Sequence, residues 1–441
     1  MKTEQQPLTI TALDEEGRGV THIDGKVCFL TDALIGETVT SYRLLRNKKN
    51  YAVGEALSVR NPSSLRSKPL CPHFGVCGGC SLQHIDVGAQ VAIKQRVLED
   101  ALSHIGKVHP EQILSPIYGI KSGYRFRARM SVKYVAKKGG VLVGFHEKAS
   151  PFVADMMQCK IVPQHVSDLI MPLRELIGKL SVRDKLPQIE WAVGARVTVI
   201  AFRILQNLNA EDEKLLKNFI DFHQSDKHPL QLWLQPGKAD SLQPFYPQNM
   251  PPLSFRLPEF DLELLFHPTE FTQVNHQVNE IMVSRAMNLL RPQSGEVIAD
   301  MFCGLGNFSL PIARSGVQVY GVEGSQALTA RASQNAQLNG LSELCDFQVA
   351  DLFKPQEFNY EQWLACDKWL IDPPRDGAFE LARILNTSVK PHRVVYVSCK
   401  PATLARDAEV LQANGYKIKL AGVMNMFAHT SHVESVALFE C

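Results

Sequence analysis

One cysteine lies where a segment typical of a buried strand ends and a helix begins. Cys399 follows the apolar run 394–397 and precedes Lys400 and Pro401, and a proline at such a place fits the first turn of a helix. In open α/β sheets, ligands bind at the carboxyl ends of the strands. A thiol near a helix N-terminus and beside a lysine is in conditions that favour the thiolate, which is the nucleophilic form. Cys399 is therefore a candidate nucleophile, although a lone cysteine at a strand end is more often a small core residue.

A second group of cysteines has the spacing of a metal centre. Cys71, Cys77 and Cys80 lie close together, with a proline and two glycines among them, and Cys159 follows further along. Thiolates select zinc or an iron–sulfur cluster. Zinc sites usually take two close-spaced pairs of ligands, whereas three neighbouring cysteines and a distant fourth suit a [4Fe-4S] cluster. Four cysteine ligands leave no iron open to a substrate, so we expect a structural cluster; the alternative is a set of unrelated buried thiols.

A loop that contains two glycines indicates a nucleotide-like ligand. Gly304 and Gly306 follow an expected strand and precede an expected helix, so the backbone can approach a ligand closely and helix N–H groups can point at it. A dinucleotide fingerprint requires a third glycine where this chain has Ser309, and nothing else in the sequence supports a nicotinamide cofactor.

Three carboxylates follow the next strands in order. Glu323 ends the second expected strand, where a ribose diol would lie, and Asp351 ends the third, where it suits an adenine edge. Asp372 ends the fourth and begins the turn Asp-Pro-Pro-Arg, which two prolines stiffen. Any one acid after a strand is weak evidence, because turns and caps use Asp and Glu freely. The ordered set, with the glycine loop, resembles the class I S-adenosylmethionine-dependent methyltransferases.

Five motifs make this resemblance more specific. They lie at the glycine loop, 271–275, 372–375, 398–401 and 432–435. Together they resemble the RNA uracil-5 methyltransferase family over essentially the whole chain. The resemblance implies that Cys399 is the nucleophile and that Glu434 is the general base, with a surface carboxylate as the alternative for Glu434. It also implies the side chains that line S-adenosyl-L-methionine, namely Gln273, Phe302, Asn307, Glu323, Asp351 and Asp372.

The resemblance implies a chemistry that needs a thiolate. Uracil C5 is a weak nucleophile, and addition of Cys399 to C6 makes C5 electron-rich, so that C5 can take the methyl group from the sulfonium. A base must then remove the C5 proton so that the cysteine is expelled. The uracil must leave its stack to be reached from both faces, so base flipping is expected. The leading hypothesis is methylation of C5 of one uridine in ribosomal RNA, and three alternatives to it stay open. They are the same chemistry on another rRNA or tRNA uridine, an N- or 2′-O-methyltransferase without a nucleophile, and a non-catalytic iron–sulfur RNA-binding protein.

Three units are expected to position these residues. Residues 1–62 alternate short β-type runs with glycines and resemble the TRAM domain, an OB-like RNA-binding β-barrel. Residues 63–260 are expected to form a central β-rich domain with the cluster site, whose helical stretch at 85–107 can pack on the catalytic domain. In residues 261–441 strands alternate with helices, which predicts the doubly wound parallel α/β sheet of a class I (Rossmann-like) methyltransferase. Its expected strands lie at 297–302, 317–322, 346–350, 368–371 and 393–397, and its expected helices at 278–290, 308–314, 325–338 and 402–413.

The overall composition excludes several classes of protein. The chain has 441 residues, 47 Lys and Arg against 45 Asp and Glu, and a net charge of +2, which is ordinary for a globular protein of several domains. No apolar run reaches the roughly 20 residues of a membrane span, and the first residues do not resemble a secretory signal. We therefore expect a cytoplasmic protein with reduced cysteines and no membrane partner.

The charge is unevenly distributed along the chain. Residues 41–68 carry seven basic side chains against one acid, and residues 121–148 carry eight against one. Interleaved aromatic residues favour a nucleic-acid partner over two solvated faces. Arg125, Arg127 and Arg129 alternate along one expected strand and are candidates to clamp the RNA backbone through its phosphates. The TRAM-like unit and the four cysteines resemble the bacterial branch of the family that acts on 23S ribosomal RNA, and the resemblance implies a monomer.

Overall fold

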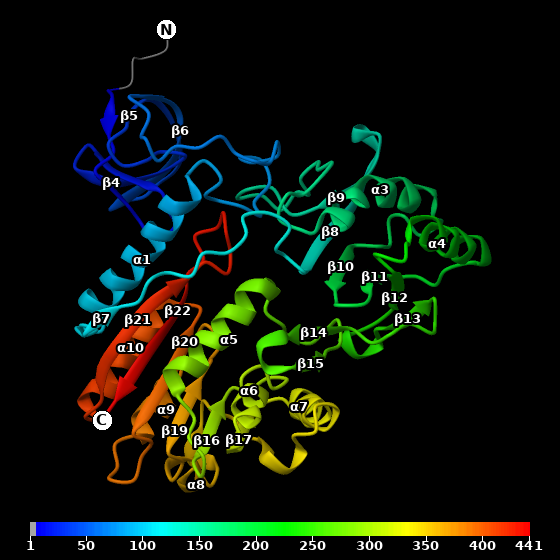
Figure 1. Ribbon diagram of the computed structural model, residues 1–441. Helices are drawn as coiled ribbons and strands as arrows, with labels where there is room; N and C mark the ends of the chain where they lie inside the picture. Colours follow the sequence, from blue (N-terminus) through cyan, green and yellow to red (C-terminus); the bar gives the residue numbers. More distant parts are fainter. Residues whose placement is uncertain (1–5) are drawn as a thin grey trace.

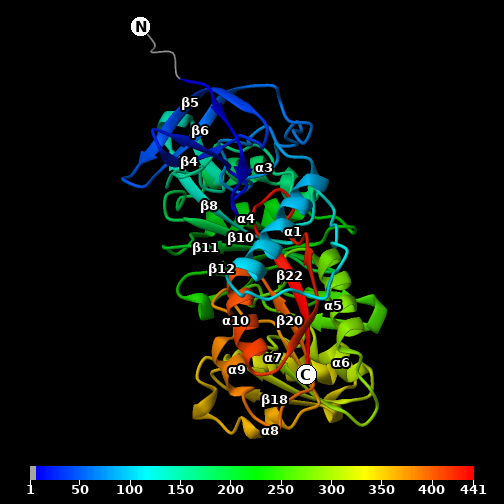
Figure 2. The same ribbon diagram turned by 90° about the vertical axis from the view of Figure 1, so that its left-hand side faces the viewer.

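The computed structural model describes residues 6–441, so the first five residues of the expected N-terminal unit lie outside the described part. Figure 1 shows the N-terminal and central units above the catalytic unit, which carries the C-terminus. From the side, the N-terminal unit lies at one end of the molecule and the edge strand β18 (Cys345–Val349) of the catalytic sheet lies at the other (Figure 2). Within residues 6–441 no helix is both long and apolar enough to cross a membrane.

The N-terminal unit is a six-stranded sheet that closes on itself. Its strands are β1 (Leu8–Thr9), β2 (Ala12–Leu13), β3 (Gly19–Ile23), β4 (Lys26–Thr31), β5 (Thr38–Asn47) and β6 (Tyr51–Arg60), in the order β1-β5-β6-β4-β3-β2. The two edge strands belong to one short segment, in which Leu8 pairs with Val39 of β5 and Ala12 pairs with Val20 of β3. Because both edges meet in that segment, the sheet forms a small closed barrel.

The central unit is a second six-stranded sheet with helices packed on it. Its strands are β8 (Arg127–Val135), β9 (Gly140–Gly144), β10 (Gln188–Val193), β11 (Thr198–Arg203), β12 (Leu230–Gln235) and β13 (Gln243–Tyr246), and its helices are α2 (Gln164–Asp168), α3 (Ile170–Lys179) and α4 (Ala210–His223). Met130 and Val132 of β8 are buried with Leu173 of α3 and Leu216 of α4 in one apolar core. Arg129, which lies between the buried residues Ala128 and Met130, faces outward, as the alternation of a strand requires.

The catalytic unit is an eight-stranded sheet flanked by helices. Its strands are β7 (Gln112–Ile113), β16 (Val297–Met301), β17 (Gln318–Glu323), β18 (Cys345–Val349), β19 (Lys368–Ile371), β20 (Arg393–Ser398), β21 (Lys417–Met424) and β22 (Glu434–Glu440), in the order β18-β17-β16-β19-β20-β22-β21-β7. Its helices are α5 (His276–Leu290), α6 (Ser309–Arg314), α7 (Gln326–Leu338), α8 (Glu361–Leu364), α9 (Phe379–Ile384) and α10 (Pro401–Ala413). A two-stranded ribbon, β14 (Ser254–Leu257) and β15 (Leu262–Leu265), precedes it. The strands and helices that we expected here are present, with ends shifted by at most two residues.

The sheet is parallel only in part. β18, β17, β16, β19 and β20 are parallel, as expected, whereas β22 is antiparallel to both β20 and β21. The five expected strands thus form the parallel part of the sheet, and the antiparallel strand β22 was not among the expected strands. Residues 425–433, which join β21 to β22, contain no helix, and parallel neighbours would need a crossover connection.

One helix from the central stretch of sequence packs on the catalytic unit. This helix, α1 (Val87–His104), runs beside β21 and α10 (Figure 1). Val91 and Leu98 of α1 are buried in the same core as Tyr396 of β20 and Leu404 of α10. Gly106 follows the helix and lies so close to the backbone of α10 that a Cβ atom there would clash. The helix is therefore fixed firmly against the catalytic sheet.

Candidate active site

The carboxyl ends of β16, β17, β19 and β20 border one cavity of about 840 Å³. Pockets of this size hold small-molecule ligands, and this edge of an open α/β sheet is where ligands bind. Every residue predicted to be catalytic or to contact the cofactor lines the cavity, namely Cys399, Glu434, Gln273, Phe302, Asn307, Glu323, Asp351 and Asp372. Side chains far apart in the sequence thus meet at one place.

The loop after β16 bends sharply at the cavity. Phe302 has a φ of 64°, Gly304 of 56° and Gly306 of 96°. The left-handed region is open to glycine but uncommon for a phenylalanine, and such outliers concentrate at functional sites. The amide of Gly304 donates a hydrogen bond to Oε2 of Glu323 at 3.2 Å. The bend therefore ties the loop to the end of the next strand, β17.

Two carboxylates and two aromatic rings form one side of the cavity. Glu323 also accepts a hydrogen bond from the amide of Ser325 at 2.9 Å, and Asp351 accepts one from the amide of Phe353 at 3.0 Å. The rings of Phe302 and Phe353 lie 5.7 Å apart with their planes at 57°. Fixed carboxylates beside aromatic rings suit a nucleoside, whose hydroxyl groups donate hydrogen bonds and whose base is flat.

Two polar contacts behind the loop hold it in place, and the sequence pattern reveals neither of them. Asn279 of α5 and Asn307 exchange two hydrogen bonds, each of 2.9 Å. Asp300 is fully buried at the end of β16 and accepts a hydrogen bond from Oγ of Ser309 at 2.5 Å. Burial raises the pKa of Asp300 to about 7. Ser309, which occupies the place of the third dinucleotide glycine, thus anchors the start of α6.

Cys399 and Glu434 are contributed by neighbouring strands. Ser398, the last residue of β20, pairs with Ser435 of β22, and the two strands are antiparallel. Cys399, the residue after Ser398, therefore lies opposite Glu434, the residue before Ser435. Glu434 is buried, and burial together with Asp372 raises its pKa to about 8. A carboxyl group with a pKa in this range is a stronger base than an ordinary carboxylate.

The thiol of Cys399 is less acidic than expected. Its position near a helix N-terminus and beside Lys400 predicted conditions that favour the thiolate. Burial, Glu434 and Asp372 instead raise the pKa of Cys399 to about 11, and Arg375 lowers it only in part. The prediction is wrong because the side chain of Lys400 is exposed to solvent, whereas two carboxylates face the thiol from inside the cavity.

The mouth of the cavity carries residues that were not predicted as site residues. Nη2 of Arg375 lies 3.4 Å from Nδ1 of His432. Burial and nearby cations, Arg375 first, lower the pKa of His432 to about 4, so its ring is neutral near pH 7. The ring of Phe427 meets that of His432 edge-on at 4.7 Å. The motifs at 372–375 and 432–435 contain Arg375 and His432, whereas no motif identifies Phe427.

Two of the three arginines that were expected to form one phosphate clamp are engaged by other groups of the protein. Arg125 lines the cavity. Arg127 donates hydrogen bonds to the backbone carbonyl groups of Pro268 and Glu270, and Arg129 forms an ion pair with another side chain of its own sheet. The prediction of a joint clamp is wrong because Arg127 is already used to hold the segment before Gln273.

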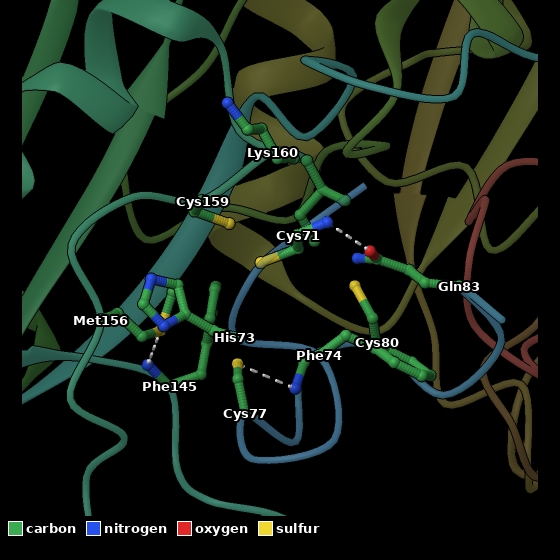
Figure 3. Close-up of a pocket in the computed structure, with 12 residues that line it drawn as sticks. Cys71, His73, Phe74, Cys77, Cys80, Gln83, Phe145, Met156, Cys159 and Lys160 are labelled. Atoms are coloured by element: carbon green, nitrogen blue, oxygen red, sulfur yellow. Dashed lines mark hydrogen bonds between the residues drawn. The ribbon is translucent and has the colours of Figure 1, made fainter. Parts of the chain in front are cut away.

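The four cysteines of the predicted metal centre line one small cavity in the central unit. Figure 3 shows the sulfur atoms of Cys71, Cys77, Cys80 and Cys159 pointing into a common space. Burial and then the neighbouring thiols raise the pKa of Cys80 to about 12, and burial is the main cause that raises that of Cys159 to about 11. Residues 6–441 contain no group of three or more His, Cys, Asp or Glu side chains placed to hold a metal ion. The [4Fe-4S] cluster therefore stays a prediction.

The chain is similar to known proteins over almost its whole length. Residues 88–441 match the tRNA (uracil-5-)-methyltransferase family. A protein of Nitrosospira multiformis, named 23S rRNA (uracil(1939)-C(5))-methyltransferase RlmD, is 57% identical over 436 residues, which are 98% of this chain and 98% of that protein. A protein of the same name from Chromobacterium violaceum is 53% identical over 432 residues, which are 98% of this chain and 84% of that protein.

A solved structure shares the fold. It is the crystal structure of the Pyrococcus abyssi tRNA (uracil-54, C5)-methyltransferase in complex with S-adenosyl-L-homocysteine. It aligns with a TM-score of 0.75 at 24% sequence identity, and the alignment covers 98% of this chain and 100% of that chain. The mixed α/β fold is thus that of S-adenosylmethionine-dependent methyltransferases. The chain belongs to the tRNA (uracil-5-)-methyltransferase family and is an S-adenosylmethionine-dependent RNA methyltransferase.

Proposed function

We propose that this chain transfers a methyl group from S-adenosyl-L-methionine to C5 of one uridine of 23S ribosomal RNA, which gives 5-methyluridine. Relatives that are more than half identical are named as methyltransferases of uracil 1939, so the corresponding uridine is the proposed target. The observation that carries the proposal is the opposition of Cys399 and Glu434 on the cavity that Glu323 and Asp351 also line.

The inner part of the cavity is the proposed cofactor site. S-adenosyl-L-methionine, when bound, supplies an electrophilic methyl group on its sulfonium. Glu323 is proposed to accept hydrogen bonds from the ribose hydroxyl groups, and Asp351 to bind the adenine edge beside the rings of Phe302 and Phe353. The fixed geometry of both carboxylates supports these roles. Three further residues complete the proposed set, namely Gln273, Asn307 and Asp372.

Cys399 is the proposed nucleophile. Its thiolate adds to C6 of the flipped uracil, and the electron pair of the C5–C6 double bond moves onto the ring carbonyl as an enolate. C5 is then electron-rich and forms the bond to the methyl carbon, while the bond between that carbon and the sulfonium sulfur breaks and leaves its electron pair on the sulfur. Because the pKa of Cys399 is raised, the thiol must lose its proton before attack, and Arg375 is the nearby cation that favours the thiolate.

Glu434 is the proposed base of the second half of the reaction. After methyl transfer, C5 carries both a hydrogen and the new methyl group. The Glu434 carboxylate removes that hydrogen as a proton, the C5–C6 double bond re-forms, and the bond between C6 and sulfur breaks. Cys399 leaves with its electron pair as a thiolate. The raised pKa of Glu434 supports this role, because it strengthens the carboxylate as a proton acceptor.

The N-terminal barrel and the basic residues are proposed to bind the ribosomal RNA. The barrel resembles a TRAM domain, and the exposed side chains of Arg46, Lys48 and Lys49 lie where β5 turns into β6. Basic side chains on a small barrel supply phosphate contacts without sequence preference. We propose a monomer that acts on 23S ribosomal RNA in the cytoplasm.

The cysteine cavity is the proposed site of a [4Fe-4S] cluster. Four thiols of the central unit converge on one space (Figure 3). Ligands spread around a space suit a cluster of several atoms better than one zinc ion. Cys71, Cys77, Cys80 and Cys159 would hold the four irons, and the cluster would serve the structure of this unit.

Mass spectrometry of 23S ribosomal RNA from cells that lack this chain tests the proposed function. We expect one 5-methyluridine to be absent, and we expect the wild-type chain but not Cys399→Ala to restore it. A full complement of 5-methyluridine in the deficient cells would overturn the proposed substrate. Restoration by Cys399→Ala would instead support an N- or 2′-O-methyltransferase, which needs no nucleophile.

A further inference from the structure

A lysine of α1 is buried beside the proposed active site. Lys94 is 1% exposed. Its ammonium donates hydrogen bonds to Oδ1 of Asn425 and to the backbone carbonyl of Phe427, each of 2.8 Å. A buried ammonium is rare and costly unless it is compensated, and Lys94 belongs to a helix that precedes the catalytic unit in the sequence. The roles proposed for Cys399 and Glu434 do not explain why this lysine is buried here.

Both acceptors of Lys94 lie in the connection between β21 and β22, residues 425–433. This connection carries Phe427 and His432 at the cavity and leads directly into Glu434. Gln90, one turn earlier on the same face of α1, accepts a hydrogen bond from the amide of His429 at 2.7 Å. Two side chains of α1 thus hold the connection at its start and in its middle.

The charge of Lys94 also acts on Glu434. Burial and Asp372 raise the pKa of Glu434, whereas Lys94 and, less strongly, Arg375 lower it. Burial in turn lowers the pKa of Lys94, and the negative charge of Glu434 raises it. The thiol of Cys399 faces Glu434 from the end of β20. Because the ammonium and the carboxyl group influence each other, they titrate as a pair.

We propose that Lys94 is a positioning residue for the base: its ammonium fixes the connection 425–427 and stabilises the Glu434 carboxylate in the form that accepts the C5 proton. This inference rests on the proposed role of Glu434. Arg375 is exposed at the mouth of the cavity, whereas Lys94 is buried in the protein interior. Helix α1 is therefore a part of the active site that lies outside the strand-and-helix alternation of the catalytic unit.

Lys94→Gln tests the inference, since glutamine keeps hydrogen-bond donors but removes the charge. The measurement is the pH dependence of RNA release in single turnover, with Glu434→Gln as the reference for a lost base. Without the Lys94 charge, the pKa of Glu434 should rise. We therefore expect the acid limb of the pH–rate profile of Lys94→Gln to move to higher pH by about one unit, which makes RNA release roughly tenfold slower at a given pH on that limb. We also expect RNA to remain attached to Cys399 during turnover. Thermal unfolding close to that of the wild type shows that the variant is folded.

Asn425→Leu is the matched control, because it removes one hydrogen bond of Lys94 and leaves the charge. We expect its acid limb to stay at the wild-type pH. Two results would overturn the inference, provided that Glu434→Gln still fails to release RNA. One is an acid limb of Lys94→Gln at the wild-type pH, and the other is an acid limb of Asn425→Leu displaced as far as that of Lys94→Gln. Release at the wild-type rate by Glu434→Gln would instead overturn the proposed base itself. If Lys94→Gln does not fold, Lys94→Arg keeps the charge, and a displaced limb in that variant overturns the inference.

Discussion

Cys399 and Glu434 face each other at the end of the catalytic sheet, because β20 and β22 are antiparallel neighbours in which Ser398 pairs with Ser435. The two groups also interact electrostatically, since Glu434 contributes to the raised pKa of Cys399. A thiol can form a bond to a ligand in the cavity, and a carboxylate can accept a proton from it. In the proposed reaction, a flipped base would thus lie between a thiol and a carboxylate that come from neighbouring strands.

The thiol of Cys399 is expected to react slowly with iodoacetamide at neutral pH. Its pKa is raised to about 11 by burial, Glu434 and Asp372. Below that pH, the thiolate fraction and the alkylation rate therefore increase about tenfold for each unit by which the pH is raised. Peptide mass spectrometry follows the labelling of Cys399, and the exposed Cys441 reports the reactivity of the reagent. Labelling of Cys399 at neutral pH as fast as that of Cys441 would contradict this account.

Glu434→Gln should separate the two halves of the reaction. The variant keeps the nucleophile but has no carboxylate to remove the C5 proton, so methylated RNA is expected to stay attached to Cys399. Turnover should fall at least about 100-fold, while denaturing gels show the attached RNA. Glu361→Gln, at an exposed site of the same unit, should behave as the wild type. Normal release of RNA by Glu434→Gln would show that another group is the base.

Glu323→Ala should weaken the binding of S-adenosyl-L-methionine. The carboxylate is held by the amides of Gly304 and Ser325 in a fixed orientation, and the loss of charge-assisted hydrogen bonds to ribose hydroxyl groups should raise Kd about 10- to 100-fold. Isothermal titration calorimetry measures this change. The exposed Glu343 offers the control Glu343→Ala. Equal affinity in both variants would remove Glu323 from the cofactor site.

The cysteine cavity should hold iron in protein that is purified without oxygen. We expect a brown protein with about four iron atoms per chain. Cys159→Ser should lower the iron content and the temperature of unfolding, because it removes one of four ligands that join distant parts of the central unit. Cys441→Ser, at an exposed thiol, should change neither. A colourless protein that contains zinc would refute the cluster.

Much of the catalytic unit could be predicted because its signals are local. Short apolar runs alternate with helical stretches, and each carboxylate of the site follows such a run directly, as Glu323 and Asp351 do. Parallel strands place their carboxyl ends at one edge of the sheet. The order of acids along the chain therefore predicts that they meet in space, and they do line one cavity.

The parts that could not be predicted depend on contacts between distant segments. Nothing near Arg127 in the sequence shows that the carbonyl groups of Pro268 and Glu270 will occupy it. The antiparallel pairing of β22 depends on the connection 425–433, which contains no helix. Lys94 reads as one polar residue of an amphipathic helix, and only the packing of α1 on the catalytic sheet reveals that it is buried.

The most direct test of the account uses RNA in which the target uridine carries fluorine at C5. Fluorine does not leave as a proton does, so after Cys399 has added to C6 and the methyl group has been transferred, Glu434 cannot complete the elimination. The account predicts a complex of protein and RNA that survives denaturation, carries the labelled methyl group, and yields a peptide modified at Cys399. Methyl transfer to this RNA without an attached product, or the same attached product from Cys399→Ala, would contradict it.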